Sequence, residues 1–565
     1  MIEKKWKVLN EDITKPIIDR ILENRGISPK EKETYLNPDF SRHQHDPFLM
    51  EGMEVAVKRI IQALRKKEHI LVFGDYDADG VTATTLLYDF FREAEANVSF
   101  ILPHRMVDGY GITPKGVRKA HKRGANLIIT VDNGISAVDA VIEANSLGID
   151  VIITDHHKQN GELPPAYVVV NPNQNSCSYP FKGIAGVGVA YKVVQAVGSK
   201  IWHQERLEKF IRWNLDLVAM GTVADICPMV DENRVFVTYG LQVIGKSKRE
   251  GIKALLRVTG DPTERIDTQT IGFRLGPRLN AAGRLEAADK ALNLLLSKTP
   301  EEAMKIANEL NKINSRRQEF TAQGLSEAEE MINPDEKMLI VSSKTWHPGI
   351  IGLISGRLTE KYGRPSLVLT LGHEEGKFAG SGRSIESFDI TNAFSQVEEL
   401  LLSYGGHKQA GGMALTEENL ETVKERILDY ATTTIEESDL IPIVNIDTEI
   451  STEDATMETI EAIKTIGPFG ERNRIPVFAL RNTRVLNVRT VGYNDQHLKM
   501  SVRKNNRFFE CIGFNLGDLI HNLKYGDMVD IAFNLLINSW NGKRTIQLRL
   551  IDVKNKSSQN GNGIY

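Results

Sequence analysis

Gly74-Asp75-Tyr76-Asp77-Ala78-Asp79-Gly80 follows directly on a short apolar run, His69-Ile-Leu-Val-Phe73. Comparable runs rich in β-branched residues recur at 97–102, 126–131, 150–154 and 167–170, and helix-like sequence separates most of them. This alternation predicts an α/β fold with a doubly wound parallel sheet. Ligands of such sheets bind at the carboxyl ends of the strands, so the residues after each run are candidates for a functional site.

Acidic residues and histidines stand at these strand ends. The run 126–131 leads into Asp132, the run 150–154 leads into Asp155-His156-His157, and Asp225 follows a helix expected over 205–223. The predicted sheet edge therefore collects Asp75, Asp77, Asp79, Asp132, His156, His157 and Asp225. Carboxylates gathered this closely would repel one another strongly, so the pattern indicates bound cations. Carboxylates with imidazoles suit Mn²⁺ or Mg²⁺, and two such ions about 4 Å apart can activate water on a phosphoester.

Two of these patterns also allow a purely structural interpretation. A single aspartate after a strand is commonly a helix cap or turn residue, and for Asp155 this alternative stays open. Four separate acidic segments with a double histidine among them favour a metal site.

A glycine-rich pattern also stands at Gly183-Ile-Ala-Gly186-Val-Gly188. It does not directly follow a strand with a suitably placed acidic residue. A tight turn into a helix over 189–198 is therefore favoured over a dinucleotide-binding loop.

Length and composition set the broad class of protein. A chain of 565 residues is too long for one core and predicts three or four domains. We find no apolar stretch of about 18 residues and no apolar run behind the N-terminus, so neither a membrane span nor a signal peptide is expected. The three cysteines, Cys177, Cys227 and Cys511, are scattered. That argues against a disulfide framework or a thiolate zinc site and fits a cytoplasmic protein.

The remaining segments divide the chain into six parts. We expect an N-terminal extension at 1–50 that packs on the catalytic domain, the catalytic domain at 51–298, a long connecting helix at 299–335 with a capped start at Thr299, a second α/β domain at 336–440, an all-β barrel or sandwich at 441–555, and a disordered tail at 556–565.

The C-terminal end is basic. Residues 470–565 hold 15 Lys and Arg against 7 Asp and Glu, a net charge of +8. Because the whole chain has a net charge of −4, the rest of the chain carries −12. A basic β-domain with Phe508, Phe509 and Trp540 suits single-stranded nucleic acid, with cations for phosphates and rings for bases. Alternatively the rings belong to the core, and Phe508 and Phe509 must point to opposite faces of a strand.

Asp155-His156-His157, preceded by Asp75-x-Asp77-x-Asp79 and Asp132, resembles the DHH phosphoesterase superfamily, and within it the RecJ-type single-strand-specific exonucleases. The likeness extends to Pro103-His104-Arg105 with Gly109-Tyr110-Gly111, to 276–284 (GPRLNAAGR), to Trp346-His347-Pro348-Gly349 and to 405–412 (GGHKQAGG). It covers residues 40–555. The last two motifs resemble the DHHA1 accessory domain that follows a DHH domain, and the family places an OB-fold at the C-terminal end.

The resemblance implies roles at the metal site. Asp75 and Asp77 would hold one ion, Asp79, His156 and Asp225 the other, and Asp132 would bridge the two. His157 would face the scissile phosphate as an electrostatic stabiliser or proton donor, which makes His157 and Asp132 the expected catalytic residues. Related pyrophosphatases carry a histidine ligand four residues before the position of Asp77. That position is Phe73 here, and Asp75 would substitute for it.

Substrate contacts are expected from several further residues. Arg105 resembles the arginine that anchors a terminal phosphate, although without the family a surface salt bridge would be the favoured interpretation. Arg278, Asn280 and Arg284 would contact nucleotides from a Gly- and Ala-punctuated stretch where backbone can approach a ligand. Ser381-Gly382-Arg383-Ser384 is interpreted as a donor-rich loop in which Arg383 helps to define the 5′ end, while Arg357 follows the backbone. His407, in a Gly-rich loop, is either a substrate contact or structural.

These features together predict a metal-dependent 5′-to-3′ exonuclease that degrades single-stranded DNA to mononucleotides in DNA repair and recombination. The polarity comes from the resemblance alone. The expected cofactors are two Mn²⁺ or Mg²⁺ ions. The expected partners are single-stranded DNA, a single-strand-binding protein and a RecQ-type helicase. The protein itself is expected to be a monomer. One alternative is a DHH-family phosphodiesterase for short oligoribonucleotides or cyclic dinucleotides. Another is a catalytically silent nucleic-acid-binding relative.

Overall fold

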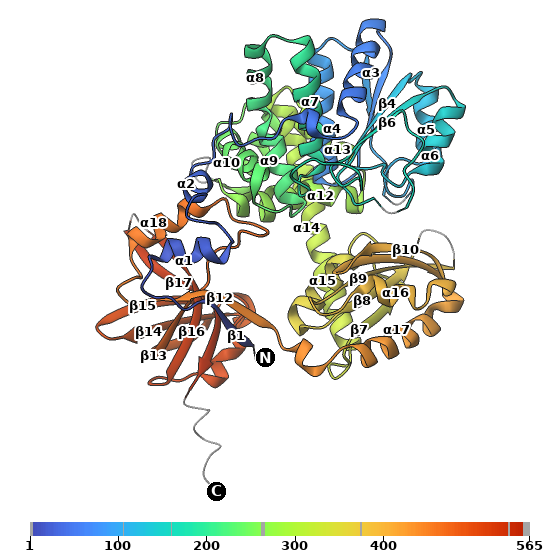
Figure 1. Cartoon of the computed structure of the whole chain (residues 1–565). Helices are drawn as coiled ribbons and strands as arrows, with labels where there is room; N and C mark the ends of the chain where they lie inside the picture. The colour runs from blue at the N-terminus through green and yellow to red at the C-terminus, as the bar shows by residue number, and fades with distance from the viewer. Residues whose placement is uncertain are drawn as a thin grey trace.

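Three β-sheets organise the chain in the computed structural model, which describes residues 4–105, 107–159, 161–261, 266–372, 376–540 and 543–556 (Figure 1). Two of the sheets have five strands and the third has seven. The expected α/β architecture with a second α/β domain and a C-terminal barrel is confirmed. Within the described ranges, no helix is long and apolar enough to cross a membrane.

The first sheet is parallel throughout and has the strand order β3-β2-β4-β5-β6. Its strands are β2 (Ile70–Phe73), β3 (Val98–Ile101), β4 (Leu127–Val131), β5 (Asp150–Thr154) and β6 (Val168–Val170). Ile70 and Val72 face one hydrophobic core with α3 (Met53–Lys66), α4 (Ala78–Glu93) and α7 (Gly186–Ile201). Leu71 and Phe73 face another with α5 (Pro114–Lys122) and α6 (Val138–Ser146). Helices therefore cover both faces, as the sequence predicted.

A helical subdomain completes the catalytic domain. It contains α8 (Gln204–Trp213), α9 (Leu215–Ala224), α10 (Asp231–Gly245), α11 (Glu250–Thr259), the π-helix η3 (Thr270–Leu275), α12 (Gly276–Leu285) and α13 (Asp289–Leu296). The single helix expected over 205–223 is wrong, because the chain breaks at Asn214. The buried Asn214 amide bonds to the carbonyl of Phe210 at 2.8 Å and accepts a hydrogen bond from Arg249, which fixes the break.

The long helix α14 (Pro300–Met331) joins the catalytic domain to the second α/β domain. Thr299 caps it by accepting the amide of Glu302 at 3.3 Å, as predicted. It packs against α11, α12 and α13 on one side and α15 (Ile351–Tyr362) on the other (Figure 1). The helix thus fixes how the two α/β domains face each other.

The second sheet has the order β10-β11-β9-β8-β7. Its strands are β7 (Leu339–Ser343), β8 (Ser366–Leu371), β9 (Lys377–Arg383), β10 (Leu401–His407) and β11 (Ala410–Thr416), covered by α15, α16 (Ile390–Ser395) and α17 (Leu420–Thr434). Ser381 and Arg383 end strand β9, and His407 ends strand β10, so the loops predicted for both segments are wrong. Gly382 and Gly411 make room for Ile390 and Phe394, which is packing that a glycine-rich sequence does not reveal.

The C-terminal domain is a closed five-stranded barrel. It contains β13 (Phe478–Val491), β14 (His497–Lys504), β15 (Arg507–Gly513), β16 (Met528–Trp540) and β17 (Lys543–Asn555), and pairing of β13 with β16 closes it. An all-β domain was expected, but α18 (Met457–Ile466) packs Ile460 and Ile463 into the barrel core. The disordered tail predicted for 556–565 lies outside the described residues except for Lys556, which pairs with Asp530 at 3.2 Å.

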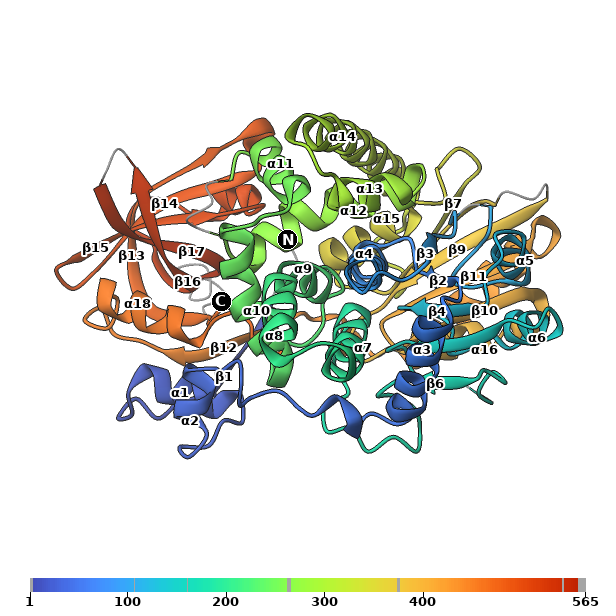
Figure 2. The ribbon, with the colours of Figure 1, turned by 90° about the horizontal axis from the view of Figure 1, so that it is seen from above.

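The N-terminal segment packs mainly on this barrel domain, which corrects the expectation that 1–50 packs on the catalytic domain. Strand β1 (Lys5–Asn10) pairs in parallel with β12 (Ile443–Glu449), and α1 (Ile17–Asn24) buries Ile21 and Leu22 in the barrel core. Figures 1 and 2 both place α1 beside the barrel domain, far from the first sheet. Only the end of the segment, with Phe40 and Met50, joins the catalytic core.

Replacing Arg25 with Ala should loosen the barrel domain. Arg25 Nη1 lies 2.8 Å from Asp447 Oδ1, and the two side chains are only 9% and 11% exposed. Removing one member of such a buried pair costs about 3–5 kcal/mol, so we expect faster amide hydrogen exchange in β12.

Lys15→Ala is the matched control, because it breaks a pair with Glu23 of the same 2.8 Å length between side chains that are 44% and 38% exposed. It should cost far less, because solvent screens an exposed pair. Unchanged exchange in β12 of the Arg25 variant would contradict the assignment of the N-terminal segment to the barrel domain.

Candidate metal centre

The loop after β2 is shaped by its own aspartates. Asp77 caps α4, and its Oδ1 accepts the amides of Asp79 at 2.9 Å and Gly80 at 3.0 Å. Asp75 is 2% exposed, and a Cβ on Gly80 would lie 2.7 Å from its Cα and Cβ. The loop therefore needs glycine at position 80 to bring Asp75 and Asp77 to the same sheet edge.

Asp79 is held by the N-terminus of a second helix. Its carboxylate accepts the amides of Gly186 at 2.7 Å and Val187 at 2.9 Å, at the start of α7. Free amides at a helix N-terminus favour an anion. The glycines at 186 and 188 lie inside α7, so the tight turn predicted for them is wrong. A Cβ on Gly186 would lie 2.6 Å from Asp132 Oδ1, which makes this glycine part of the site.

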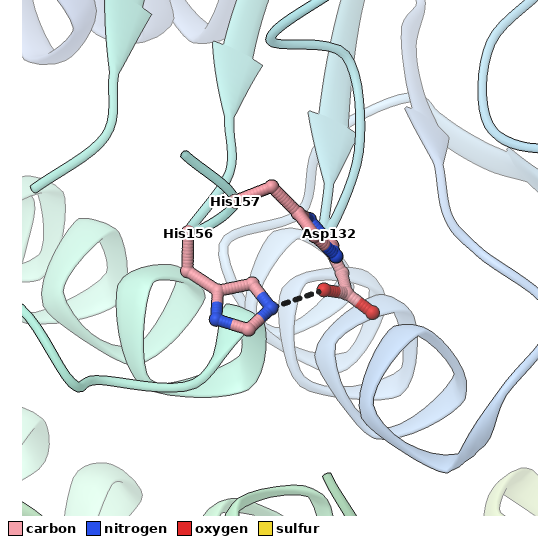
Figure 3. A group of neighbouring side chains, drawn as sticks. All are labelled: Asp132, His156 and His157. Atoms are coloured by element: carbon pink, nitrogen blue, oxygen red, sulfur yellow. Dashed lines mark ion pairs between the residues drawn. The ribbon is translucent and has the colours of Figure 1, made fainter. Parts of the chain in front are cut away.

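Asp132 lies beside the double histidine (Figure 3). It follows β4 with a backbone φ of 63°, a left-handed conformation that costs energy in a non-glycine residue and is typical of functional sites. His156 Nε2 lies 3.0 Å from Asp132 Oδ1. The same nitrogen lies 3.9 Å from Asp79 Oδ2 and 3.8 Å from Asp225 Oδ2. Four strand and helix ends therefore converge on one imidazole, as the sequence predicted.

Three overlapping groups could hold a divalent ion. They are Asp75 with Asp77 and Asp132, Asp132 with His156 and His157, and His156 with Asp225 and Cys227, each with ligand atoms within 4.8 Å of one another. Asp75 Oδ1 and Asp132 Oδ1 are buried and accept no hydrogen bond in the part of the chain described. Leaving such oxygens unsatisfied is costly, so the donor set fits a cation.

The charges of the cluster also show the need for a counter-ion. Burial raises the pKa of Asp75, Asp79 and Asp132 well above the ordinary value, and repulsion between neighbouring carboxylates raises it further. Burial lowers the pKa of His156, which favours the neutral imidazole that a metal requires. Without a cation the carboxylates would tend to bind protons instead.

His157 is positioned by Asp155. Asp155 Oδ1 accepts His157 Nδ1 at 2.7 Å and the amides of His156 and His157 at 2.7 and 3.1 Å. Burial lowers the pKa of His157, but the bond to Asp155 outweighs it and the pKa rises to about 9. The Tyr110 hydroxyl lies 3.3 Å from the same ring. Sequence reasoning left open whether Asp155 is a cap and gave it no role at the site. Its position beside the double histidine was the available signal.

The second α/β domain reaches the same place. A cavity of about 490 Å³ is lined by Tyr110 and His157 from the catalytic domain and by Gly405, Gly406 and His407 from β10. Burial lowers the pKa of His407, and the charges of Lys158 and His157 lower it further. The structure thus brings His407 beside His157, and the two domains enclose the candidate site together.

Arginines gather at the metal loop. Arg105 lies with its Cζ 5.2 Å from the centre of the Tyr76 ring. Burial lowers the pKa of Arg284 to about 10, and repulsion from Arg105 and then Arg317 adds to the effect. Burial also lowers the pKa of Arg383, as does Arg105. Among the described residues, Arg105, Arg284 and Arg383 form no ion pair with a carboxylate, which leaves them available to an anion.

The other predicted substrate residues have local partners. Asn280 Oδ1 accepts the amide of Ala78 at 2.6 Å, so Asn280 supports the metal loop. Arg278 donates to Asn311 on α14 at 3.0 Å and to the carbonyl of Arg274 at 2.7 Å. Arg357 is exposed on α15, and Ser381 borders Gly352. The small residues at 276–284 let α12 approach the loop itself, since a Cβ on Gly283 would lie 2.3 Å from the Tyr76 carbonyl.

Three family descriptions match the chain: the DHH family N-terminal domain over residues 69–222, the DHHA1 domain over 335–433 and the RecJ OB domain over 446–552. The single-stranded-DNA-specific exonuclease RecJ of Bacillus subtilis is 37% identical over 555 residues, 98% of this chain and 70% of that protein. The protein of that name in Escherichia coli is 35% identical over 560 residues, 95% of this chain and 96% of that protein.

Solved structures show the same relationship. The crystal structure of RecJ from Thermus thermophilus in complex with Mn²⁺ superposes with a TM-score of 0.83 at 28% identity, covering 97% of this chain and 79% of that one. The structure of the same protein in complex with Mg²⁺ gives a TM-score of 0.78 at 27% identity, with coverages of 97% and 78%.

Gly186→Ala should weaken Mn²⁺ binding. The new Cβ would meet Asp132 Oδ1 at 2.6 Å and force the carboxylate or the start of α7 to shift. We expect affinity measured by calorimetry to fall about 10–100-fold, the usual loss for groups that position ligands. Gly198→Ala in the same helix is the control, because its Cβ would meet only the flexible end of Leu207 at 2.5 Å. Equal affinity in Gly186→Ala and wild type would show that the contact does not position Asp132.

Asp155→Asn should lower the pKa of His157 in the metal-free protein. The wild-type pKa of about 9 lies above the ordinary value of 6.5. Without the Asp155 carboxylate, burial favours the neutral ring and only the weaker attraction of Asp225 and Asp75 opposes it. An NMR titration of the ring protons measures this, with exposed histidines as internal controls.

The same shift gives the sign of the pH dependence. Because the folded pKa of His157 is the higher one, its contribution to stability is complete below about pH 6.5 and is lost as pH rises through about 9. The stability difference between wild type and Asp155→Asn should shrink over that window. A pKa of His157 that is unaltered by Asp155→Asn would contradict the pairing.

Proposed function

Because this chain belongs to the RecJ family of single-stranded-DNA-specific exonucleases, we propose that it hydrolyses single-stranded DNA from the 5′ end to mononucleotides, in DNA repair and recombination. The observation that carries the proposal is the position of Asp132. It belongs to two candidate ion groups at once, one with Asp75 and Asp77 and one with His156. A shared carboxylate between two groups suits a pair of divalent ions acting on one phosphodiester.

The ligands divide between two sites in the proposal. Asp75, Asp77 and Asp132 would hold one ion, and Asp132, Asp79, His156 and Asp225 the other. The Thermus thermophilus relative has been solved in complex with Mn²⁺ and with Mg²⁺, which supports either ion here. When bound, such ions lower the pKa of a water and stabilise charge on the phosphate oxygens. Phe73 is buried in the sheet and supplies no ligand.

His157 acts on the substrate rather than on an ion in this proposal. Its Nδ1 is engaged by Asp155 at 2.7 Å, which directs Nε2 to the cavity that the two α/β domains enclose. Since the pKa of the ring is about 9, His157 is protonated near neutral pH. A protonated imidazole there can stabilise charge on the scissile phosphate or donate the Nε2 proton to the leaving oxygen.

The arginine cluster beside the metal loop would set the 5′-to-3′ direction of cleavage. A terminal phosphate carries more charge than an internal one. Arg105, Arg284 and Arg383 present cations beside the metal loop that have no carboxylate partner in the described part of the chain. We assign the 5′-phosphate to this cluster. The DNA strand would then contact Arg278, Arg357, Ser381 and His407, while Asn280 supports the metal loop. A strand held by its 5′ end at this cluster would present its first phosphodiester to the metal centre.

The barrel domain would hold the strand before cleavage. Residues 470–565, which include the five barrel strands, carry a net charge of +8 that favours phosphates. Phe508 is 65% exposed, and Arg503 Cζ lies 5.5 Å from the centre of its ring, whereas Phe509 is in the core. Of these two rings, Phe508 is therefore the one that can stack on a base. The Trp540 side chain lies outside the described part of the chain.

Apolar side chains are also exposed between the barrel and the metal centre. Ile226, beside Asp225, is 70% exposed, and Phe273 is 79% exposed. The segments that carry them reach the barrel domain through the Met229 amide, 2.8 Å from the Glu471 carbonyl, and Thr268 Oγ1, 2.6 Å from the Phe469 carbonyl. Bases of a strand that passes from the barrel to the ions would pack on these two side chains. The monomeric state, the cytoplasmic location, the single-strand-binding protein and the RecQ-type helicase stay predictions.

Digestion of a long strand tests the proposal. We expect Mn²⁺ or Mg²⁺ to support release of mononucleotides from a 5′-labelled single strand, and Asp132→Ala to abolish it, a loss of at least about 10³-fold, because one carboxylate serves both ion groups. Strand binding measured by fluorescence anisotropy should persist. Asp518→Ala, on the barrel, is the control and should cleave normally.

The rival functions predict other outcomes. Cleavage of a dinucleotide but not of the long strand would favour a short-oligonucleotide phosphodiesterase. Binding without cleavage under any divalent ion would favour a silent relative. RNA strands and 3′-labelled strands, run in parallel, test the choice of nucleic acid and the polarity.

A further inference from the structure

One thiol lies inside the ligand cluster. Cys227 Sγ is 3.3 Å from Asp225 Oδ2, and the residue is 7% exposed. The sulfur lies within 4.8 Å of ligand atoms of both Asp225 and His156. Asp132 Oδ1, 3.0 Å from His156 Nε2, is buried and accepts no hydrogen bond from the described residues. The thiol therefore borders a set of ligand atoms that is short of positive charge.

Three of these atoms are spaced to hold one ion. In a tetrahedral site with bonds of about 2.0–2.3 Å, neighbouring ligand atoms lie about 3.5 Å apart. The separations here are 3.3 Å from Cys227 Sγ to Asp225 Oδ2 and 3.8 Å from Asp225 Oδ2 to His156 Nε2, and the three residues offer ligand atoms within 4.8 Å of one another. The donor set is one sulfur, one nitrogen and one oxygen.

Sulfur changes which ion this set prefers. Mn²⁺ and Mg²⁺ favour oxygen ligands and gain little from a thiolate, whereas Zn²⁺, Co²⁺ and Cd²⁺ bind sulfur strongly. A four-coordinate ion that takes the Cys227 sulfur as a ligand loses one position that a catalytic ion keeps for water or a phosphate oxygen.

We propose that Cys227 is a latent ligand at the His156–Asp225 site and captures thiophilic divalent ions there. The sulfur–metal bond forms as the thiol proton passes to solvent, with no change of oxidation state. Sulfur then occupies a position that water or a phosphate oxygen would take, so Zn²⁺ or Cd²⁺ arrests the enzyme that Mn²⁺ or Mg²⁺ activates. The inference rests on the proposed function for the identity of the site and adds the class of ion that blocks it.

Titration with Co²⁺ or Cd²⁺ tests the sulfur bond without measuring cleavage. When either ion is added to the metal-free wild-type chain, we expect a thiolate-to-metal charge-transfer band to appear in the ultraviolet. Cys227→Ser should lose the band and bind Cd²⁺ about 10–100-fold more weakly, while Mn²⁺ affinity stays within a factor of about three.

The chain supplies its own controls, because its other two thiols are also buried. Cys177 accepts the Glu51 amide at 3.5 Å, and Cys511 lies in the barrel core. Cys177→Ser and Cys511→Ser should keep the band. Circular dichroism checks that each variant is folded, and Cys227→Val repeats the test should serine disturb the fold.

The outcomes separate this inference from the proposed function. A wild-type chain that cleaves DNA with Mn²⁺ but shows no charge-transfer band, or a band that survives in Cys227→Ser, overturns the role of Cys227. A band that depends on Cys227 in a chain that does not cleave DNA supports the thiol ligand and overturns the exonuclease proposal. Inhibition of cleavage by Cd²⁺ should weaken in Cys227→Ser by the same factor as Cd²⁺ binding.

Discussion

Repulsion between buried carboxylates is the constraint on which this molecule depends. A parallel sheet brings the carboxyl ends of β2 and β4 to one edge, so Asp75 and Asp132 must lie together once the strands pair. Burial and mutual repulsion raise the pKa values of these acids. The fold offsets part of the negative charge with the amides of two helix N-termini, of α4 for Asp77 and of α7 for Asp79. Bound cations would neutralise the negative charge that is left.

The same constraint fixes features far from the loop. Gly186 and Gly221 must lack a Cβ because Asp132 and Asp79 carboxylate oxygens lie 2.6 Å from where it would be. Gly283 lets α12 rest on Tyr76, and Gly349 of the second α/β domain lies against the carbonyl of Arg284. A continuous chain of close backbone contacts therefore runs from the metal loop through α12 to the second domain. Arg284, one of the three arginines that could receive a phosphate, lies on this chain of contacts.

The sequence was sufficient for the parts of the site that follow from strand ends. Each apolar run became a strand, and the acids after it became neighbours, because strand order in a parallel sheet leaves little choice at the carboxyl edge. Contacts between segments far apart in the chain could not be predicted from the sequence. Nothing in Lys5–Asn10 indicates that its partner is β12, over 400 residues away, and Gly382 and Gly411 do not reveal that they accommodate Ile390 and Phe394. Cys227 was counted only as one of three scattered thiols, because its neighbour His156 is distant in sequence.

Adjacent histidines at one strand end are given opposite chemistry by the acids that face them. His156 is surrounded by carboxylates that would ligate ions, its pKa is lowered by burial, and it offers a neutral nitrogen to the cluster. His157 pairs with Asp155. Burial raises the pKa of Asp155, but the hydrogen bond and charge of His157 outweigh it, and the Ile135 amide adds to the lowering. That fixed negative charge keeps the second imidazole protonated on the substrate side. The Asp155-His156-His157 motif therefore needs its aspartate as a partner for one ring, so that a ligand and a cation can stand side by side without competing for the same acid.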